Sequence, residues 1–254
     1  MKYYIWTILF SVAIYILCST EDNTPVYTLT TTASPAEAGE ITPDWPRDTT
    51  TEVVDVYNPV TGRTWMDRNL GASRMAQSSN DEEAYGDLYQ WGRAADGHEK
   101  RNSRIYHADY RYIHNSNTNA PGHGKFITGF ISDWRNPGND TLWQGSKGFN
   151  NPCPEDYRLP TKIEWEEEIL SWKSKDAAGA FASPLKLPTA GFRDNREDSR
   201  GLIVLTGPLY GAFGGYWSST IYSIYPYKLF FDSPWAGMIT DNRAHGYSVR
   251  CIKD

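Results

Sequence analysis

The chain has 254 residues, which is enough for one ordinary domain with a small additional segment. Hydrophobic residues make up 39% and charged residues 22%, a globular composition that excludes a largely disordered chain and a multi-span membrane protein. The net charge of −6 and the scattered lysines and arginines argue against a nucleic-acid partner. The many aromatic, glycine and proline residues predict short strands and long loops rather than a helical bundle.

Residues 1–18 have the pattern of an export signal. Lys2 precedes an almost uncharged apolar run over residues 3–17, which is shorter than the roughly 20 residues of a membrane span. The run ends at Cys18 and resembles a bacterial lipoprotein signal, which implies cleavage before this cysteine and a lipid on its thiol. Leu17 departs from that pattern, which has a small residue at this position. The alternatives are a signal cleaved elsewhere or not at all, and an ordinary buried apolar segment.

Residues 19–51 are rich in threonine, serine, proline and alanine and are predicted to form a tether. The acidic pair at 21–22 is similar to surface-export signals of lipoproteins, so we expect a lipid anchor at the outer membrane or cell surface. Alternation within residues 27–43 resembles the opening of an internalin-type β-repeat, which implies one remnant β-hairpin in the tether. The globular domain is expected over residues 52–254.

A β-hairpin is predicted at the start of this domain. Residues 53–57 and 63–67 have strand-like composition and flank the turn-forming segment 58–62. The two segments are therefore expected to pair with each other.

A helix is predicted next, over residues 83–94. Ala84, Leu88 and Trp91 recur at helical spacing and would place one apolar face inward. Residues 95–150 form a long polar stretch, and loops of this length are usually functional or disordered. The aromatic and aliphatic residues within it argue against disorder.

A second helix is predicted to begin after Thr161. Thr161 and Glu164 have the spacing of a capping box, in which each side chain accepts a hydrogen bond from the backbone of the other residue. The rest of the chain is expected to form strands and turns, with apolar or aromatic segments at residues 185–187, 202–205, 215–220, 227–231 and 247–252.

Three cysteines are present, Cys18, Cys153 and Cys251. With Cys18 assigned to the lipid, an exported chain with two further cysteines is expected to pair them. A bond between Cys153 and Cys251 closes a loop of about 98 residues, worth on the order of 4 to 5 kcal/mol in the chain-entropy description. The alternative is two free buried thiols.

Seven motifs in fixed order then carry a family resemblance. The motifs occupy residues 65–71, 85–92, 151–154, 157–165, 187–193, 215–220 and 246–254. The first three read Trp-Met-Asp-Arg-Asn-Leu-Gly, Tyr-Gly-Asp-Leu-Tyr-Gln-Trp-Gly and Asn-Pro-Cys-Pro, and the last contains Ser-Val-Arg-Cys. Over about residues 52–254 the sequence resembles the Fibrobacter succinogenes major paralogous domain family of secreted and surface proteins. The resemblance also implies pairing of Cys153 with Cys251.

The resemblance implies an α+β fold of the C-type-lectin-like and formylglycine-generating-enzyme superfamily. In that fold two helices flank short antiparallel strands, and long loops hold the ligand site. The formylglycine-generating relatives use a reactive cysteine pair of their own, which this sequence lacks, so their oxidase activity is not expected here. A fold alone does not supply a function.

A search for catalytic motifs predicts no enzyme. The sequence contains no His-Glu-x-x-His or Gly-x-Ser-x-Gly motif, and the segment 171–175 does not form a Ser-x-x-Lys motif. The dense carboxylate clusters at 81–83 and 164–168 have the character of a polar loop and a capped helix face. We therefore expect no catalytic residue and no resident cofactor, with calcium as the one open question.

Calcium is considered because residues 133–140 are rich in oxygen ligands, although the sugar-binding motifs of C-type lectins are absent. Asp133, Asn139 and Asp140 could supply carboxylate and amide oxygens to a hard cation. The alternative is an Asx-type turn in which these side chains stabilise their own backbone.

Aromatic residues in turn-rich stretches are the candidate ligand contacts, because flat rings favour sugar rings or partner side chains. The alternative is that these rings close small cores beneath the loops. The favoured function is a surface protein that binds a glycan or a cell-envelope protein; the alternatives are a structural part of an envelope complex or fimbria-like assembly, and an enzyme. The candidate residues are Trp134, Trp143, Tyr222, Tyr225, Trp235 and Arg243.

Overall fold

The computed structural model describes residues 47–108, 117–208 and 211–254. The predicted signal 1–18, with Cys18, and most of the predicted tether lie outside these residues. In the described part of the chain, no helix is both long enough and apolar enough to cross a membrane.

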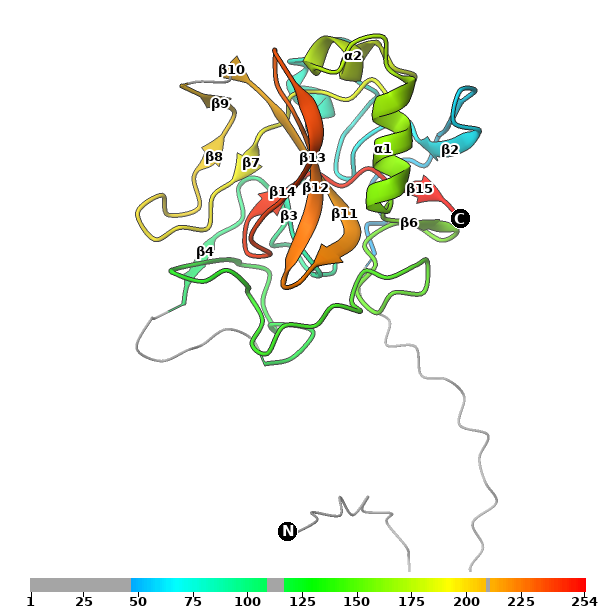
Figure 1. Ribbon diagram of the computed structural model, residues 1–254. Coiled ribbons are helices and arrows are strands. Elements are labelled where there is room, and N and C mark those ends of the chain that lie inside the picture. Colours follow the sequence, from blue (N-terminus) through cyan, green and yellow to red (C-terminus); the bar gives the residue numbers. More distant parts are fainter. Residues whose placement is uncertain (1–46, 109–116, 209–210) are drawn as a thin grey trace, which may run out of the picture. The chain divides into compact units, whose positions relative to one another are not determined.

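The predicted N-terminal hairpin is confirmed, and it shares a sheet with the end of the chain (Figure 1). Strands β1 (Asp55–Asn58) and β2 (Arg63–Met66) pair in antiparallel register. Strand β15 (Ile252–Lys253) lies between β2 and β6 (Tyr157–Arg158) and is antiparallel to both. This insertion ties the hairpin to segments about 100 and 190 residues further along the chain.

A second four-stranded sheet is built from four two-residue strands in the order β3-β14-β7-β8. These are β3 (Tyr89–Gln90), β14 (Gly246–Tyr247), β7 (Phe192–Arg193) and β8 (Ile203–Val204), all antiparallel to their neighbours. The strand expected at 202–205 is therefore present as β8. The segment expected as one strand at 247–252 is instead divided between β14 and β15, which belong to different sheets.

The third sheet has the longest strands, in the order β11-β12-β13. Strands β11 (Gly214–Tyr222) and β12 (Tyr225–Phe231) contain the two segments expected to form strands, and β13 (Ala236–Thr240) pairs with β12. Figure 1 shows this sheet between helix α1 on one side and the second sheet on the other. The sheet is therefore buried on both sides over part of its length.

Two helices lie close together in the chain. The first, α1 (Lys162–Ser171), begins at the predicted capping box, in which Thr161 and Glu164 exchange both hydrogen bonds. The second, α2 (Ala177–Ala182), begins at Asp176, whose side chain accepts a hydrogen bond from the Gly179 N–H. Capping satisfies backbone N–H groups that the first helical turn leaves unpaired.

The helix predicted over residues 83–94 is wrong. This segment contains a single 3-10 turn, η1 (Glu82–Ala84), followed by an extended chain and β3. Gly86 has a φ of +64° and lies so close to the Leu70 carbonyl that a Cβ would come within 2.4 Å of its oxygen. The apolar residues at helical spacing are all buried, but they reach the core from an irregular chain.

Two small pairs of strands complete the described structure. Strands β4 (Ile105–His107) and β5 (Phe126–Thr128) are parallel, and β9 (Thr206–Gly207) and β10 (Gly211–Ala212) are antiparallel. The apolar segment at 185–187 forms no strand, and Lys186 within it has a φ of +49°.

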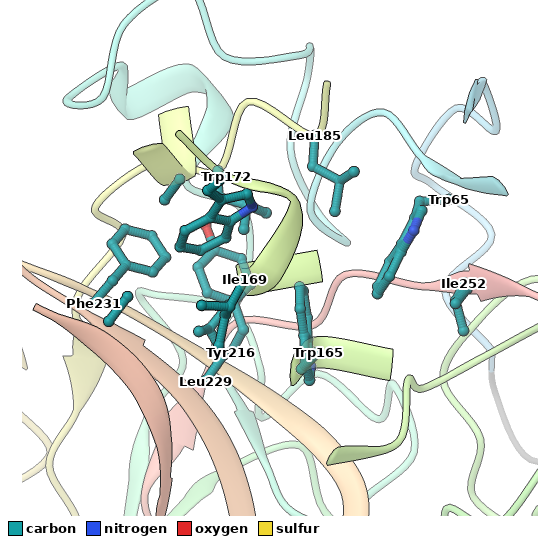
Figure 2. Packing of buried hydrophobic residues seen from close by; sticks show 12 residues of the cluster. Trp65, Trp165, Ile169, Trp172, Leu185, Tyr216, Leu229, Phe231 and Ile252 are labelled. Carbon is teal, nitrogen blue, oxygen red and sulfur yellow. The ribbon is translucent and has the colours of Figure 1, made fainter. Parts of the chain in front are cut away.

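One hydrophobic core lies between α1 and the β11-β12-β13 sheet (Figure 2). Trp165 and Ile169 of α1 pack with Tyr216 of β11 and Leu229 of β12, all nearly inaccessible to solvent. A second cluster surrounds the cysteines. Each large apolar side chain buried in this way contributes about 1.5 to 3 kcal/mol of transfer free energy.

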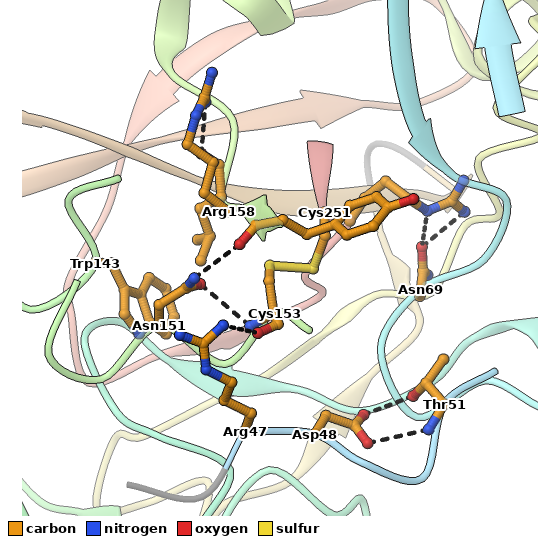
Figure 3. The surroundings of a disulfide bond; sticks show 12 residues. Arg47, Asp48, Thr51, Asn69, Trp143, Asn151, Cys153, Arg158 and Cys251 are labelled. Atoms are coloured by element: carbon orange, nitrogen blue, oxygen red, sulfur yellow. Dashed lines mark hydrogen bonds between the residues drawn. A yellow bond between two sulfur atoms is a disulfide. The ribbon is translucent and has the colours of Figure 1, made fainter. Parts of the chain in front are cut away.

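The disulfide expected between Cys153 and Cys251 is confirmed, with Cα atoms 5.9 Å apart (Figure 3). Beside it, the Asp48 N–H donates to the Pro152 carbonyl, and the Asp48 carboxylate accepts hydrogen bonds from Thr51. The folded body therefore begins by residue 47 and not at residue 52, because these polar contacts anchor the last predicted tether residues.

The described architecture is mixed, with two α-helices and several short, mostly antiparallel strands, as expected for the α+β class. One face of the β11-β12-β13 sheet is only partly covered, since Trp235 and Ile239 are exposed.

Candidate functional site

Strand β13 directs alternate side chains to opposite sides of its sheet. Met238 packs against the core beneath α1. Gly237 and Ile239 point the other way, and the same alternation places Trp235 and Asp241, which flank the strand, on this second side. The strand thus has one core side and one side that is open over much of its length.

Strand β12 adds two residues to the open side. Phe230 is the cross-strand partner of Gly237, and Lys228 is the partner of Ile239. Phe192 of β7 and His245, just before β14, border the same surface, since the Phe192 ring centroid lies 6.0 Å from the Lys228 Nζ and the His245 Nδ1 lies 2.9 Å from Asp241. We call this surface the β13 face and define it by Phe192, Lys228, Phe230, Trp235, Ile239, Asp241 and His245.

Trp235 is presented by a tight turn between β12 and β13. The Asp232 N–H donates to the Trp235 carbonyl at 2.9 Å, and the Asp232 carboxylate accepts from the Trp235 N–H at 3.0 Å. The indole lies over Gly237, where a Cβ would come within 2.3 Å of a ring atom. The residue is nevertheless 45% exposed. The ring is therefore supported from below by backbone and accessible from outside.

A row of aromatic rings backs Trp235. The Phe230 ring centroid lies 6.2 Å from that of Trp235 and 5.6 Å from that of the buried Phe213. Phe213 in turn lies 5.9 Å from Phe192. Ring pairs at these separations attract beyond their area of contact, so these contacts stabilise this part of the face.

The opposite end of the face is polar and centred on His245. Its Nδ1 lies 2.9 Å from an Asp241 carboxylate oxygen, and its Nε2 lies 3.4 Å from one of Asp194. Burial by itself would lower the pKa of His245, but the two carboxylates raise it overall. His245 therefore links the chain after β13 to the chain after β7.

Lys228 is the second buried cation at this end. Its ammonium group donates to the Asp241 carboxylate and contacts the Tyr247 hydroxyl, which itself donates to Asp241 at 2.7 Å. Burial lowers the pKa of Lys228 and raises that of Tyr247 well above its usual value. Burial would raise the pKa of Asp241, but His245 and Lys228 hold it well below its ordinary range. The cluster is thus a compensated network of charges.

Sequence reasoning named Trp235 but missed the rest of the face. The available signal was the alternation of Trp235, Gly237, Ile239 and Asp241, which is typical of a half-covered strand. No local pattern indicates that His245 lies beside this strand, because the contact depends on how β14 packs.

Three of the predicted ligand contacts are not available to a ligand. Trp134 and Trp143 are fully buried, and their indole N–H groups donate to backbone carbonyls in the interior. Arg243 is buried with its guanidinium 4.7 Å from the ring centroid of Trp91. The alternative considered for these aromatics, a small core beneath the long loops, is what the structure shows.

Two other candidates remain accessible. Tyr222 and Tyr225 flank the β11–β12 turn and are 65% and 38% exposed. Ile224 between them is also exposed. These residues lie at the other end of β12 from the Trp235 turn, so the sequence candidates form no single site.

The predicted calcium ligands are engaged by protein groups. Asp133 accepts from the Arg135 N–H and Asn139 accepts from the Thr141 N–H, which are Asx turns. Arg243 donates to Asp140, and its Nε lies 3.7 Å from Asp133. A guanidinium thus lies beside both carboxylates, in the position where a calcium site would need the ion.

In the described chain, Asp96, His98 and Glu99 are the cluster whose ligand atoms lie close enough to hold a metal. Both His98 ring nitrogens are already used, because Nε2 accepts from the Gln90 N–H and Nδ1 lies 2.7 Å from Asp96. Burial, reinforced by Arg93, lowers the pKa of His98 to about 4, so it is neutral at pH 7. Its role is to connect β3 to the following loop.

No family model, curated protein or solved structure matches this chain. The β13 face combines a supported, accessible indole with a row of aromatic rings and a cluster of paired charges.

Proposed function

We propose that the protein is an exported surface protein, anchored through a lipid on Cys18, that binds a glycan with its β13 face. The observation that carries this proposal is the indole of Trp235, seated over Gly237 and 45% exposed. An accessible ring that is already fixed in position binds a flat ligand face with little loss of conformational entropy.

The fold proposed for the domain is C-type-lectin-like, in agreement with the resemblance to the Fibrobacter succinogenes major paralogous domain family. Two helices, short antiparallel strands and the long segment at 95–150 support this proposal. The buried tryptophans of that long segment favour the β13 face as the binding surface in place of the long loops.

The chemistry of the face suits a sugar. The apolar carbon–hydrogen face of one pyranose ring can stack on Trp235, and the next ring of a glycan can contact Ile239. Hydroxyl groups of a further ring of the glycan can donate hydrogen bonds to the partly exposed Asp241 carboxylate, which accepts them. Specific ligand sites in general combine many apolar contacts with a few fixed polar groups.

The test is a glycan array probed with the purified full-length protein in detergent, followed by titration calorimetry on the best ligand. Trp235→Ala should weaken binding by about tenfold or more, since a hot-spot aromatic contributes more than about 1.4 kcal/mol. Tyr57→Ala removes an aromatic ring of similar exposure from strand β1 and should leave affinity unchanged.

Three outcomes would count against the proposal. If no glycan binds to protein with an intact disulfide, glycan recognition is wrong. If Tyr222→Ala abolishes binding and Trp235→Ala does not, the site lies at the β11–β12 turn. A chelator that removes binding would show a calcium requirement that this face does not explain.

A protein ligand is the second candidate. Tyr222, Ile224 and Tyr225 expose three apolar side chains within four residues, and such patches favour protein contacts. The observation would also suit a structural part in an envelope assembly. Cross-linking of cells that carry either the wild-type protein or the Ile224→Asp variant tests this candidate. A protein partner that binds at the β11–β12 turn should be captured with the wild type and lost with the variant, whereas a ligand of the β13 face should be retained by both.

A further inference from the structure

We infer that the ligand of the β13 face is an uncharged oligosaccharide extended along β13, and not a monosaccharide or an acidic glycan. This inference rests on the proposed glycan-binding function. It concerns the length and charge of the ligand, which follow from the layout of the face and from its ion pairs.

The length follows from the positions of the two ends. Trp235 precedes the first residue of β13 and Asp241 follows the last. Because the indole lies over Gly237, four residue steps of extended chain separate it from Asp241, or about 13 Å at 3.3 Å per residue. A single pyranose ring is much shorter than this, so one sugar unit contacts the indole or the polar cluster but not both.

The middle of the face is suited to a continuous ligand. Ile239 is 37% exposed between the two ends, and its neighbour on β12 is Lys228. Phe230 fills the space between Lys228 and the Trp235 indole. An extended chain of sugar rings would therefore meet apolar surface between the indole and His245.

The charge follows from how the polar groups are paired. Asp241 contacts Lys228 and His245, and Asp194 contacts His245 and Arg196. Each carboxylate of the cluster is thus compensated by cations, and each of these cations lies against a carboxylate. A uronate or sialate would bring its negative charge toward Asp241 and Asp194 without an uncompensated cation to receive it.

Calorimetry with chemically defined oligosaccharides tests both parts of the inference. The probes are gluco-, manno-, xylo- and chito-oligosaccharides of one, two, four and six units, together with oligogalacturonates of the same lengths. For the neutral series that binds, affinity should rise by about tenfold or more from one to four units and then level off. The oligogalacturonates should bind at least about tenfold more weakly at the same length.

The variant Ile239→Asn tests the path of the ligand. It should reduce the affinity for four units toward that for one unit and leave the one-unit affinity unchanged, because only the longer ligand crosses Ile239. Ile224→Asn is the matched control at an exposed isoleucine of the β11–β12 turn, and it should preserve the dependence on length.

The outcomes separate this inference from the function on which it rests. Absence of binding to every probe removes the proposed function, and this inference with it. Binding that needs Trp235 but does not increase with length, or that prefers oligogalacturonates, leaves glycan recognition standing and overturns the inference.

Discussion

At the scale of single residues, the most informative groups are buried and titratable. His245 lies between Asp241 and Asp194, while Glu99 is buried beside other acids. Neither was identified as special from its place in the sequence. Their properties arise from charges contributed by segments far away in the chain, and those charges make stability depend on pH.

Replacement of His245 by glutamine should destabilise the protein in acid more than in alkali. The unfolded imidazole titrates near 6.5, and the pKa in the folded protein is raised, so the charged form stabilises the fold fully below about pH 6.5. This contribution is lost as the pH rises through the folded pKa. The loss on substitution should be about 2 kcal/mol at pH 5.5, the size of a hydrogen bond to a charged group.

Thermal unfolding of the wild type and His245→Gln at pH 5.5 and pH 9 measures this difference. A gap between the two melting temperatures that is as large at pH 9 as at pH 5.5 would contradict the role of His245 as a charged link. His98→Gln is unsuitable as a control, because His98 is buried in its neutral form.

Replacement of Glu99 by glutamine should stabilise the protein at pH 8. Burial, aided by Asp87 and Asp96, raises the pKa of Glu99 from 4.5 to about 7, so the folded state holds a carboxylate above pH 7 that it disfavours. Below about pH 4.5 the group is protonated in both states and the penalty disappears. We expect a gain on the order of 2 kcal/mol at pH 8 and little change at pH 4.

Urea unfolding at the two pH values gives the required free energies. Glu155→Gln is an exposed control that should change stability little at either pH. A Glu99→Gln variant that is less stable than wild type at pH 8 would show that the carboxylate is needed in its charged form.

At the scale of elements, sequence patterns gave correct predictions where they determine the start of a helix or the turn of a hairpin. The capping box at Thr161 and Glu164 and the hairpin around Gly62 depend on residues within a few positions of each other. The helix prediction for residues 83–94 was wrong because apolar residues at helical spacing indicate which side chains are buried and not which backbone conformation buries them. Gly86 and Gly92, both at positive φ, allow the chain to turn between the buried side chains.

Replacement of Thr161 by alanine should cost about 1 kcal/mol of stability. The substitution removes the side-chain acceptor for the Glu164 N–H at the start of α1. Urea unfolding of Thr161→Ala beside Thr206→Ala, an exposed threonine in β9, measures the difference. An equal effect of both substitutions would mean that the cap contributes nothing beyond the loss of a threonine side chain.

At the scale of the whole molecule, segments from both ends of the domain hold each other in place. Arg250 is fully buried and donates to Asn69 and to the carbonyls of Met66 and Leu185. Burial lowers its pKa to about 10, so it remains charged at pH 7. Beside it, the disulfide joins residues 98 positions apart. These links close the second core cluster.

Removal of the disulfide should lower the free energy of unfolding by on the order of 4 kcal/mol, because a cross-link across 98 residues restricts the unfolded chain. The double variant Cys153→Ser, Cys251→Ser should unfold at a lower urea concentration than wild type. Cys18→Ser removes a cysteine outside the bond and should keep the wild-type midpoint. Equal midpoints for all three proteins would show that the bond does not contribute.

The sequence alone determined the features that depend on neighbours in the chain. These are the first hairpin, the cap of α1, the two long strands of the third sheet and, from the count of cysteines, the disulfide. Each follows from turn chemistry, alternation or elimination among few alternatives. Trp235 was also a sequence candidate.

The tertiary structure decided which surface is open. Trp134 and Trp143 look the same as Trp235 in sequence, since all three lie in turn-rich stretches, but only Trp235 is exposed. His245 joins the β13 face because β14 and β7 pack against β12. Burial and charge pairing depend on such contacts between distant segments, and a local pattern does not encode them.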